Sequence, residues 1–102
     1  MTEPSAIAIN VRDNVVTVTR NIARGEVVRY RMGDEWREVV AVDAVPFGHK
    51  IAIERIAEGE VVRKYGESIG GATRSIEPGR HVHSHNAASL RALTDQLEGI
   101  ES

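Results

Sequence analysis

The segment IAEGEVV, residues 56–62, is one of four copies of a short pattern along the chain. The other copies are IARGEVV at 22–28, VPFGHKI at 45–51 and IEPGRHV at 76–82. In each copy a β-branched residue precedes a glycine by three positions, and Val or Ile follows that glycine by three positions. Glycine adopts a positive φ without steric cost, so it suits a tight turn between two buried aliphatic residues. We therefore predict four such turns, which we call the glycine corners.

Strand-like segments surround the glycine corners. SAIAINV at 5–11 and VVTVTR at 15–20 alternate apolar with small or polar residues, and the intervening RDN is a turn signal, so residues 5–20 are predicted to form a β-hairpin. WREVVAV at 36–42 is a further predicted strand. The corners start 23, 11 and 20 residues apart, which is too irregular for a solenoid. The pattern predicts a compact, mainly β domain of short strands over residues 1–86.

A helical pattern occurs clearly only once, after residue 86. In AASLRALTDQLE, residues 87–98, Leu90, Leu93 and Leu97 fall at i, i+3 and i+7 and so share one helical face. We predict a C-terminal amphipathic helix or tail over residues 87–102, with the helix beginning at Ala87.

Composition excludes several classes of function. The chain has 102 residues, a net charge of −2 and no cysteine. Lys and Arg are scattered, so the electrostatic footprint of a nucleic-acid-binding protein is absent. Without cysteine there are no disulfides, thiolate metal sites or Cys nucleophiles. Apolar runs are short and the N-terminus does not have the pattern of a signal peptide, so we expect a cytoplasmic protein with no membrane partner.

The segment HVHSHN, residues 81–86, places His81, His83 and His85 at alternate positions. On a strand these positions share one face, and Val82 points to the core. Imidazole suits both proton transfer near neutral pH and metal binding. Two neighbouring imidazoles can converge on one ion, but three on one straight strand converge poorly, so at least one has another role. Polar decoration of a strand is the alternative without chemistry.

Three motifs within residues 45–86 resemble those of the SAF-type β-clip domain of the altronate and galactarate dehydratase family, which also occurs as the small subunit of sulfolactate sulfo-lyase. The motifs are GHK at 48–50, the run from Lys64 to Gly66 followed by Ile69 and Gly70, and HVHSHN at 81–86. The resemblance implies a β-clip fold. It also implies a hydro-lyase subunit that is inactive alone and that eliminates water from a sugar acid, such as altronate or galactarate, together with a separate large catalytic subunit.

The candidate site residues are assigned with this chemistry in view. Dehydration next to a carboxylate needs a base, an acid and stabilisation of the developing charge. We predict His83 and His85 as catalytic residues, and His81, His83 and His85 as candidate ligands of a divalent metal, iron or manganese, held mainly with the large subunit. Substrate contacts are assigned to His49, Lys50, Lys64 and Asn86. His49 is also a candidate member of the histidine cluster.

Several alternatives stay open at the level of sequence. Asn86 is as well suited to capping a helix at Ala87 as to contacting substrate. The chain also fits the small subunit of a sulfolactate sulfo-lyase, or a non-catalytic carbohydrate-binding SAF module. Assembly of several copies into a homo-oligomer is possible.

Overall fold

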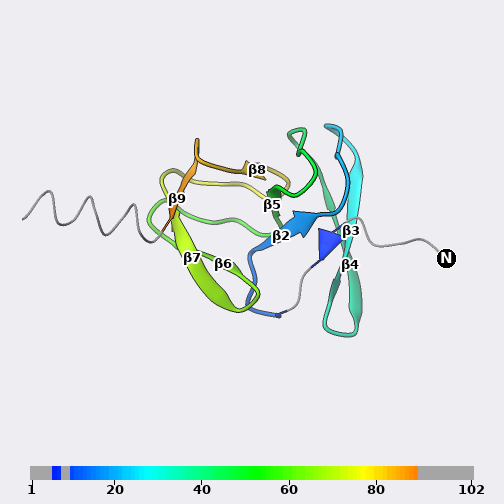
Figure 1. Ribbon diagram of the computed structural model, residues 1–102, viewed down its shortest axis with the longest axis horizontal. Helices are drawn as coiled ribbons and strands as arrows, with labels where there is room; N and C mark the ends of the chain where they lie inside the picture. The colour runs from blue at the N-terminus through cyan, green and yellow to red at the C-terminus, as the bar shows by residue number, and fades with distance from the viewer. Residues whose placement is uncertain (1–5, 8–9, 90–102) are drawn as a thin grey trace, which may run out of the picture.

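The computed structural model describes residues 6–7 and 10–89. These residues form nine strands and no helix, as predicted for a mainly β domain (Figure 1). Six strands form one sheet in the order β4-β3-β1-β2-β5-β8, and three form a second sheet in the order β6-β7-β9. The strands are β1 Ala6–Ile7, β2 Val15–Val18, β3 Val27–Met32, β4 Glu35–Val40, β5 Lys50–Ala52, β6 Val61–Lys64, β7 Glu67–Ala72, β8 His81–Val82 and β9 Ala87–Ser89.

The predicted N-terminal hairpin and third strand are present. β1 pairs antiparallel with β2, with Ala6 opposite Val18. β4 corresponds to the strand predicted at 36–42, although it begins at Glu35 and ends at Val40. β3 shows why these segments form strands: its residues alternate between exposed and buried positions, as the period of a β-strand requires.

The four glycine corners are confirmed. Gly25, Gly48, Gly59 and Gly79 all have positive φ values. At Gly79 the backbone also passes close to another strand, because a Cβ added there would lie 2.1 Å from the Val40 carbonyl oxygen. The first and last aliphatic residues of every corner are buried, and they are Ile22, Val28, Val45, Ile51, Ile56, Val62, Ile76 and Val82.

The corners are arranged as two structurally equivalent halves. In the first half Ile22 and Val45 form an isolated antiparallel bridge, and in the second half Ile56 and Ile76 form the same bridge. The β3–β4 hairpin lies between the members of the first bridge and the β6–β7 hairpin between those of the second. Figure 1 shows these hairpins at opposite ends of the domain, with β2, β5 and β8 between them.

A glutamate side chain stabilises the first corner of each half. The Glu26 carboxylate accepts a hydrogen bond from the Ala23 amide over 2.9 Å. The Glu60 carboxylate accepts the equivalent bond from the Ala57 amide over 3.0 Å. The two acidic residues of IARGEVV and IAEGEVV that precede the final Val-Val therefore fix their turns.

Two hydrophobic clusters lie on either side of the β2–β5 pair. Val16 and Ile51, which are paired across these strands, belong to one cluster. Val15 and Ala52, the next pair, belong to the other. Because neighbouring strand residues point to opposite faces, this central pair is buried on both sides. Both hydrophobic clusters therefore contain side chains of β2 and β5.

The helix predicted to begin at Ala87 is wrong for residues 87–89, which form β9. This strand pairs with β7, with Ala87 opposite Ala72 and Ser89 opposite Gly70. Gly70 permits the close approach, because a Cβ there would lie 2.1 Å from the Ala88 carbonyl oxygen. The sheet thus continues past the predicted boundary after residue 86. The rest of the predicted helix, residues 90–102, lies outside the described residues.

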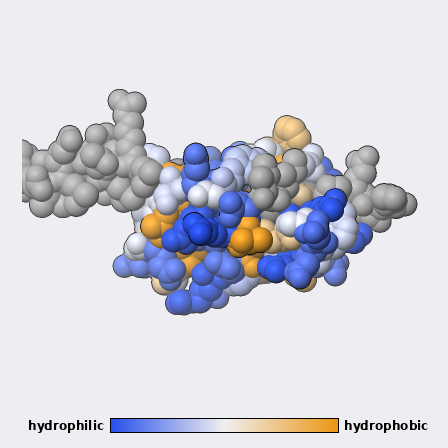
Figure 2. All heavy atoms as spheres, turned by 90° about the horizontal axis from the view of Figure 1, so that it is seen from below, coloured by the Kyte–Doolittle hydropathy of each residue, from blue (hydrophilic) through white to orange (hydrophobic). Residues whose placement is uncertain are grey.

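The surface shown in Figure 2 is mainly hydrophilic, with small separate apolar patches. Among the described residues, large exposed hydrophobic side chains include Val11, Trp36 and Phe47. Within the same part of the chain, no helix is long and apolar enough to cross a membrane.

Candidate functional site

Three histidines from two segments of the chain meet at the β5–β8 edge of the larger sheet. His49 directly precedes β5, His81 begins β8, and His83 follows β8. His49 Nδ1 lies 2.9 Å from His81 Nε2, so one ring donates a hydrogen bond to the other. The ring centroids of His49 and His83 are 4.5 Å apart. The pairing of β5 with β8, in which Ile51 lies opposite His81, brings these distant segments together.

The predicted metal ligands are only partly the residues that the fold groups together. His49, His81 and His83 each offer a nitrogen, and these three atoms lie within 4.8 Å of one another. The His85 ring is near His81, at 5.4 Å between centroids, but His85 is not a member of this group. The group therefore includes His49, which directly precedes β5, in place of His85.

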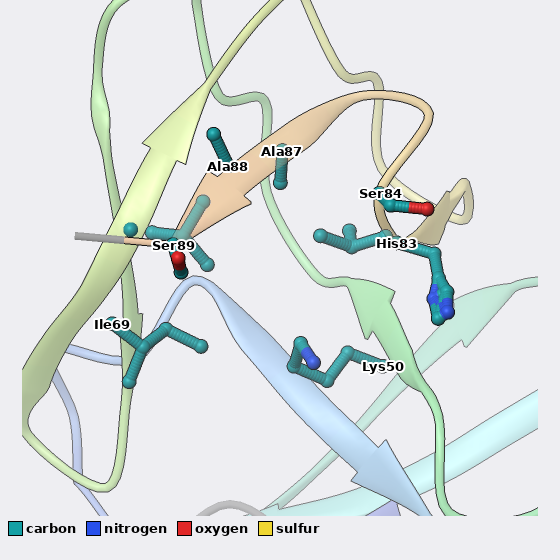
Figure 3. A pocket seen from close by; sticks show the side chains of 10 residues that line it. Lys50, Ile69, His83, Ser84, Ala87, Ala88 and Ser89 are labelled. Carbon is teal, nitrogen blue, oxygen red and sulfur yellow. The ribbon is translucent and has the colours of Figure 1, made fainter. Parts of the chain in front are cut away.

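A cavity of about 520 Å³ opens beside the histidines (Figure 3). Lys50 and His83 lie at one end, and Ile69 and Ser89 lie at the other. Most of the wall is aliphatic, and no acidic residue lines it. Such a cavity suits a small ligand whose anionic group lies against Lys50 and His83. The lining residues are Lys50, Val62, Ile69, Gly70, Val82, His83, Ser84, Ala87, Ala88 and Ser89.

Lys50 is partly buried and points into this cavity. Burial lowers the pKa of its ammonium group, and the positive charge of Lys64 lowers it further. The Lys64 ammonium lies 4.9 Å from the centre of the Tyr65 ring, a cation–π contact. Lys64 thus adds positive potential near the cavity without lining it. Two cations that disfavour each other's charge are a good environment for an anion.

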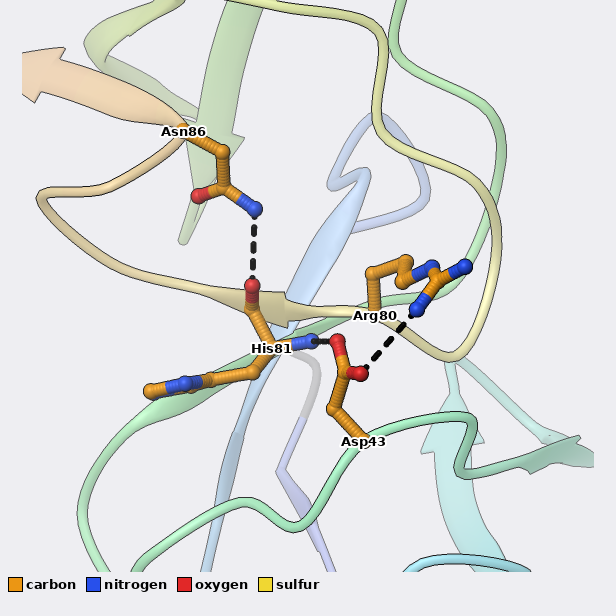
Figure 4. A network of polar contacts seen from close by, with 4 residues as sticks. All are labelled: Asp43, Arg80, His81 and Asn86. Carbon is orange, nitrogen blue, oxygen red and sulfur yellow. Dashed lines mark hydrogen bonds and ion pairs between the residues drawn. The ribbon is translucent and has the colours of Figure 1, made fainter.

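A network of polar contacts fixes the backbone that carries His81 and His83 (Figure 4). Asp43 accepts a hydrogen bond from the His81 amide at 3.1 Å and forms an ion pair with Arg80, also at 3.1 Å. The Asn86 side chain donates to the His81 carbonyl at 2.8 Å and accepts from the His83 amide at 3.0 Å. The backbone of His81 and His83 is therefore held by groups that lie behind the cluster.

The cluster environment favours neutral imidazoles. Burial lowers the pKa of His81, and the neighbouring His83, His49 and His85 lower it further, whereas Asp43 raises it. The pKa of His83 is also lowered, by desolvation first and then by His49, Lys50 and His85. A neutral imidazole near pH 7 can accept a proton or bind a metal. Both roles proposed from the sequence are compatible with this environment.

The fold buries Asn86 behind the backbone of His81 and His83. The residue is 5% exposed, and both ends of its side-chain amide are used by the His81 and His83 backbone. The alternative in which it caps a helix at Ala87 is wrong, because β9 begins there. The predicted substrate contact of Asn86 remains a prediction.

His85 faces a second cavity, of about 390 Å³, whose lining also includes Arg74, Arg80, Asp43 and Glu77. His83 and His85, the two predicted catalytic residues, therefore line different cavities. The catalytic assignment of both residues remains a prediction.

Sequence reasoning missed Asp43, which lies 38 positions from the His81 amide that it binds. The motif that contains it, AVDAVP, has no pattern that would distinguish it from a surface turn. Only the path of the chain, which carries residue 43 past the start of β8, identifies its role.

Residues 4–90 match the SAF domain of altronate/galactarate dehydratases. The chain belongs to this family. The SAF resemblance seen in its motifs is thereby confirmed. Among curated proteins, subunit alpha of (2R)-sulfolactate sulfo-lyase from Chromohalobacter salexigens is 38% identical over 78 residues, covering 74% of this chain and 83% of that protein.

Two altronate dehydratases are also similar to this SAF domain. The Bacillus subtilis protein is 38% identical over 82 residues, covering 80% of this chain and 16% of that protein. The Escherichia coli protein is 37% identical over 90 residues, covering 88% of this chain and 17% of that protein. This chain thus spans about a sixth of the altronate dehydratases that it matches.

Proposed function

We propose that this SAF domain is the small subunit of a lyase that eliminates water from a sugar acid such as altronate or galactarate. A separate large subunit completes the active site, and the small subunit is inactive alone. The observation that carries the proposal is the placement of Lys50 and His83 at one end of a cavity without acidic lining residues. The similarity to altronate dehydratases supports the choice of reaction.

Each residue at this end of the cavity has a distinct role in the proposed reaction. Lys50 binds the substrate carboxylate as a point charge. His83, neutral near pH 7, accepts the proton on the carbon next to that carboxylate or transfers a proton to the departing hydroxyl, and the large subunit supplies the complementary group. The reaction breaks one C–H and one C–O bond, forms a C=C bond and releases water. A bound divalent metal would supply electrostatic stabilisation of the charge that develops on the carboxylate.

The experiment combines the purified chain with a dehydratase-type large subunit and measures turnover of altronate and galactarate. We expect turnover only for the combined proteins. His83→Ala should lower kcat by at least about 100-fold, in the range of general acid–base catalysis. His85→Ala is the matched variant, because His85 is also exposed on the same turn but lines the other cavity. A smaller loss in His85→Ala than in His83→Ala supports the role of His83 alone, and an equal loss supports the prediction that both histidines are catalytic. Enzyme-like turnover by the chain alone would contradict the two-subunit proposal.

A second candidate reaction is elimination of sulfite from sulfolactate. It is favoured by the match to a protein named as subunit alpha of a sulfo-lyase, since this chain covers 83% of that subunit. The same Lys50 and His83 would bind the carboxylate and transfer the proton, and only the leaving group would differ. Release of sulfite, measured with the reconstituted proteins and sulfolactate, distinguishes this reaction from dehydration.

A non-catalytic carbohydrate-binding role is the remaining alternative. It predicts that Lys50→Met and His83→Ala leave turnover by the large subunit unchanged. Under the lyase proposal both substitutions lower turnover while circular dichroism shows an intact β fold.

A further inference from the structure

We infer that this chain itself holds a divalent transition-metal ion through His49, His81 and His83, and that His85 is not a ligand. One nitrogen from each of the three residues lies within 4.8 Å of the other two. Two nitrogens that are each about 2.1 Å from one ion are separated by roughly 3.0 to 3.4 Å, for octahedral and tetrahedral angles respectively. Small rotations of the side chains therefore suffice to bring all three nitrogens onto one ion.

The pair His49 and His81 already has a suitable separation. Its two facing nitrogens are 2.9 Å apart, close to the edge of an octahedral site. His83 is the exposed member of the group and lies 4.5 Å from His49 between ring centroids. Adjustment thus falls on the side chain with the most freedom to move.

The backbone of each ligand is held from outside the group. The His49 amide donates to the Pro46 carbonyl within its glycine corner. Asn86 bonds the backbone of both His81 and His83, and Asp43 bonds that of His81. Because these bonds already hold the backbone in place, less conformational freedom is lost when the rings bind an ion. The ligands thus come from two segments of the chain whose relative position is fixed by the β5–β8 pairing.

The donor set points to a class of metal. All three donors are imidazoles. Among residues 6–7 and 10–89, the carboxylate near the cluster is that of Asp43, and it is engaged with Arg80 and the His81 amide. Imidazole favours iron, cobalt, nickel, copper and zinc, whereas magnesium, calcium and manganese prefer oxygen ligands. Of the two metals expected from the family resemblance, these ligands favour iron over manganese.

The ion would face the cavity of about 520 Å³, because His83 lines that cavity together with Lys50. Positions not taken by histidine would be open to a ligand there, as in catalytic rather than structural sites. The Lys50 ammonium opposes a cation at this place, and an anionic ligand that contacts both would relieve the repulsion. The metal site can be tested by metal binding alone and does not depend on the lyase reaction. With the ion bound, a His83 nitrogen is a ligand and cannot also accept a proton, so a group of the large subunit would then make the proton transfer proposed for His83.

The test is calorimetric titration of the full-length chain with Zn²⁺, supported by the visible spectrum of its Co²⁺ complex. We expect one ion per chain. His49→Ala and His81→Ala should each weaken Zn²⁺ binding by at least about tenfold, whereas His85→Ala should leave it within about threefold. Lys50→Met should tighten binding, because it removes a like charge.

Two kinds of result would overturn the assignment. One is the absence of Zn²⁺ and Co²⁺ binding by the folded wild-type chain, or a ratio of one ion to two chains. The other is loss of affinity in His85→Ala equal to that in His49→Ala. Circular dichroism of each variant establishes that the β fold is retained, and His49→Gln, which keeps a polar side chain of similar size, replaces the alanine variant if that variant does not fold.

Discussion

The side-chain amide of Asn86 and the main-chain carbonyl of His81 form a hydrogen bond of 2.8 Å. The oxygen of the same amide accepts the His83 N–H at 3.0 Å, so one buried side chain links the two histidines on either side of Val82. The asparagine amide carries its donor and its acceptor on separate atoms, so it can bind the His81 carbonyl and the His83 N–H at the same time. Asn86 is therefore a positioning residue for the cluster.

Replacing Asn86 by Ala should lower the free energy of unfolding by about 1–3 kcal/mol, because two partly buried backbone groups lose their hydrogen-bond partner. Asn86→Asp retains only the acceptor, so its free energy of unfolding should lie between those of Asn86→Ala and the wild type. Urea denaturation measures both. Ser84→Ala is the control, since Ser84 is an exposed residue of the same turn and its loss should cost less than about 0.5 kcal/mol. Equal stability of the two alanine variants would refute the positioning role.

Gly79→Ala should destabilise the domain more than Gly48→Ala does. Both glycines have similar φ values, +90° and +82°, so both variants incur the strain of a left-handed conformation, about 1–2 kcal/mol. Only at Gly79 does the new Cβ meet backbone, 2.1 Å from the Val40 oxygen, whereas nothing lies within 4 Å at Gly48. Midpoints of urea unfolding compare the two variants, and a Gly48 variant that is the less stable would contradict this account.

At pH 7 the Glu26→Gln variant should be less stable than the wild type. This difference in stability should disappear in acid. The hydrogen bond from the Ala23 amide, and then Arg20, lower the pKa of Glu26 below its ordinary value of 4.5. A carboxyl group with a lowered pKa in the folded state stabilises the fold fully above its unfolded pKa, and this contribution is lost as the pH falls through the folded pKa.

Thermal melting between pH 7 and pH 3 should therefore show the Tm of wild type approaching that of Glu26→Gln as the pH falls. Glu58→Gln is the control, because Glu58 is an exposed residue of an equivalent corner and has no hydrogen bond or ion pair with the described residues. A constant Tm difference across this range would show that the charge of Glu26 does not contribute.

Thr17→Val should leave stability unchanged or raise it by up to about 1 kcal/mol. The Thr17 hydroxyl oxygen is buried and has no hydrogen-bond partner in the described part of the chain. Replacing an unpaired polar atom by a methyl group of similar shape removes its desolvation cost. Thr17→Ser retains the hydroxyl and loses a methyl group, and it should be destabilising. A Thr17→Val variant less stable than Thr17→Ser would indicate that the hydroxyl has a partner.

The strands and corners were predictable because their signals are local. A glycine between two aliphatic residues defines the corner at Gly59 from seven residues alone, and the alternation in 15–20 identifies β2. The failure at Ala87 has the opposite cause. The spacing of Leu90, Leu93 and Leu97 is a local helical signal, but the need of β7 for a partner along Gly70 to Ala72 determines the structure of residues 87–89.

The histidine cluster was predictable in part for the same reason. The alternation in HVHSHN identified His81 and His83, which are close in sequence. The contact of His49 with His81 spans 32 positions and depends on the pairing of β5 with β8. Sequence alone identified His49 only as a candidate member of the cluster. It also could not show that His85 lies outside the group of three nitrogens, because the position of His85 depends on the turn at 83–86.

The contact between His49 and His81 joins the two equivalent halves, so its formation reports that the halves have come together. His49 lies at the last corner of the first half and His81 at the last corner of the second, so their contact closes a loop that contains the whole β6–β7 hairpin. Cutting the chain between Ile53 and Ile56 would separate the two rings onto different fragments. When such fragments reassemble, the contact between His49 and His81 would form again only after β5 has paired with β8. Each fragment would therefore need the other to complete the histidine cluster.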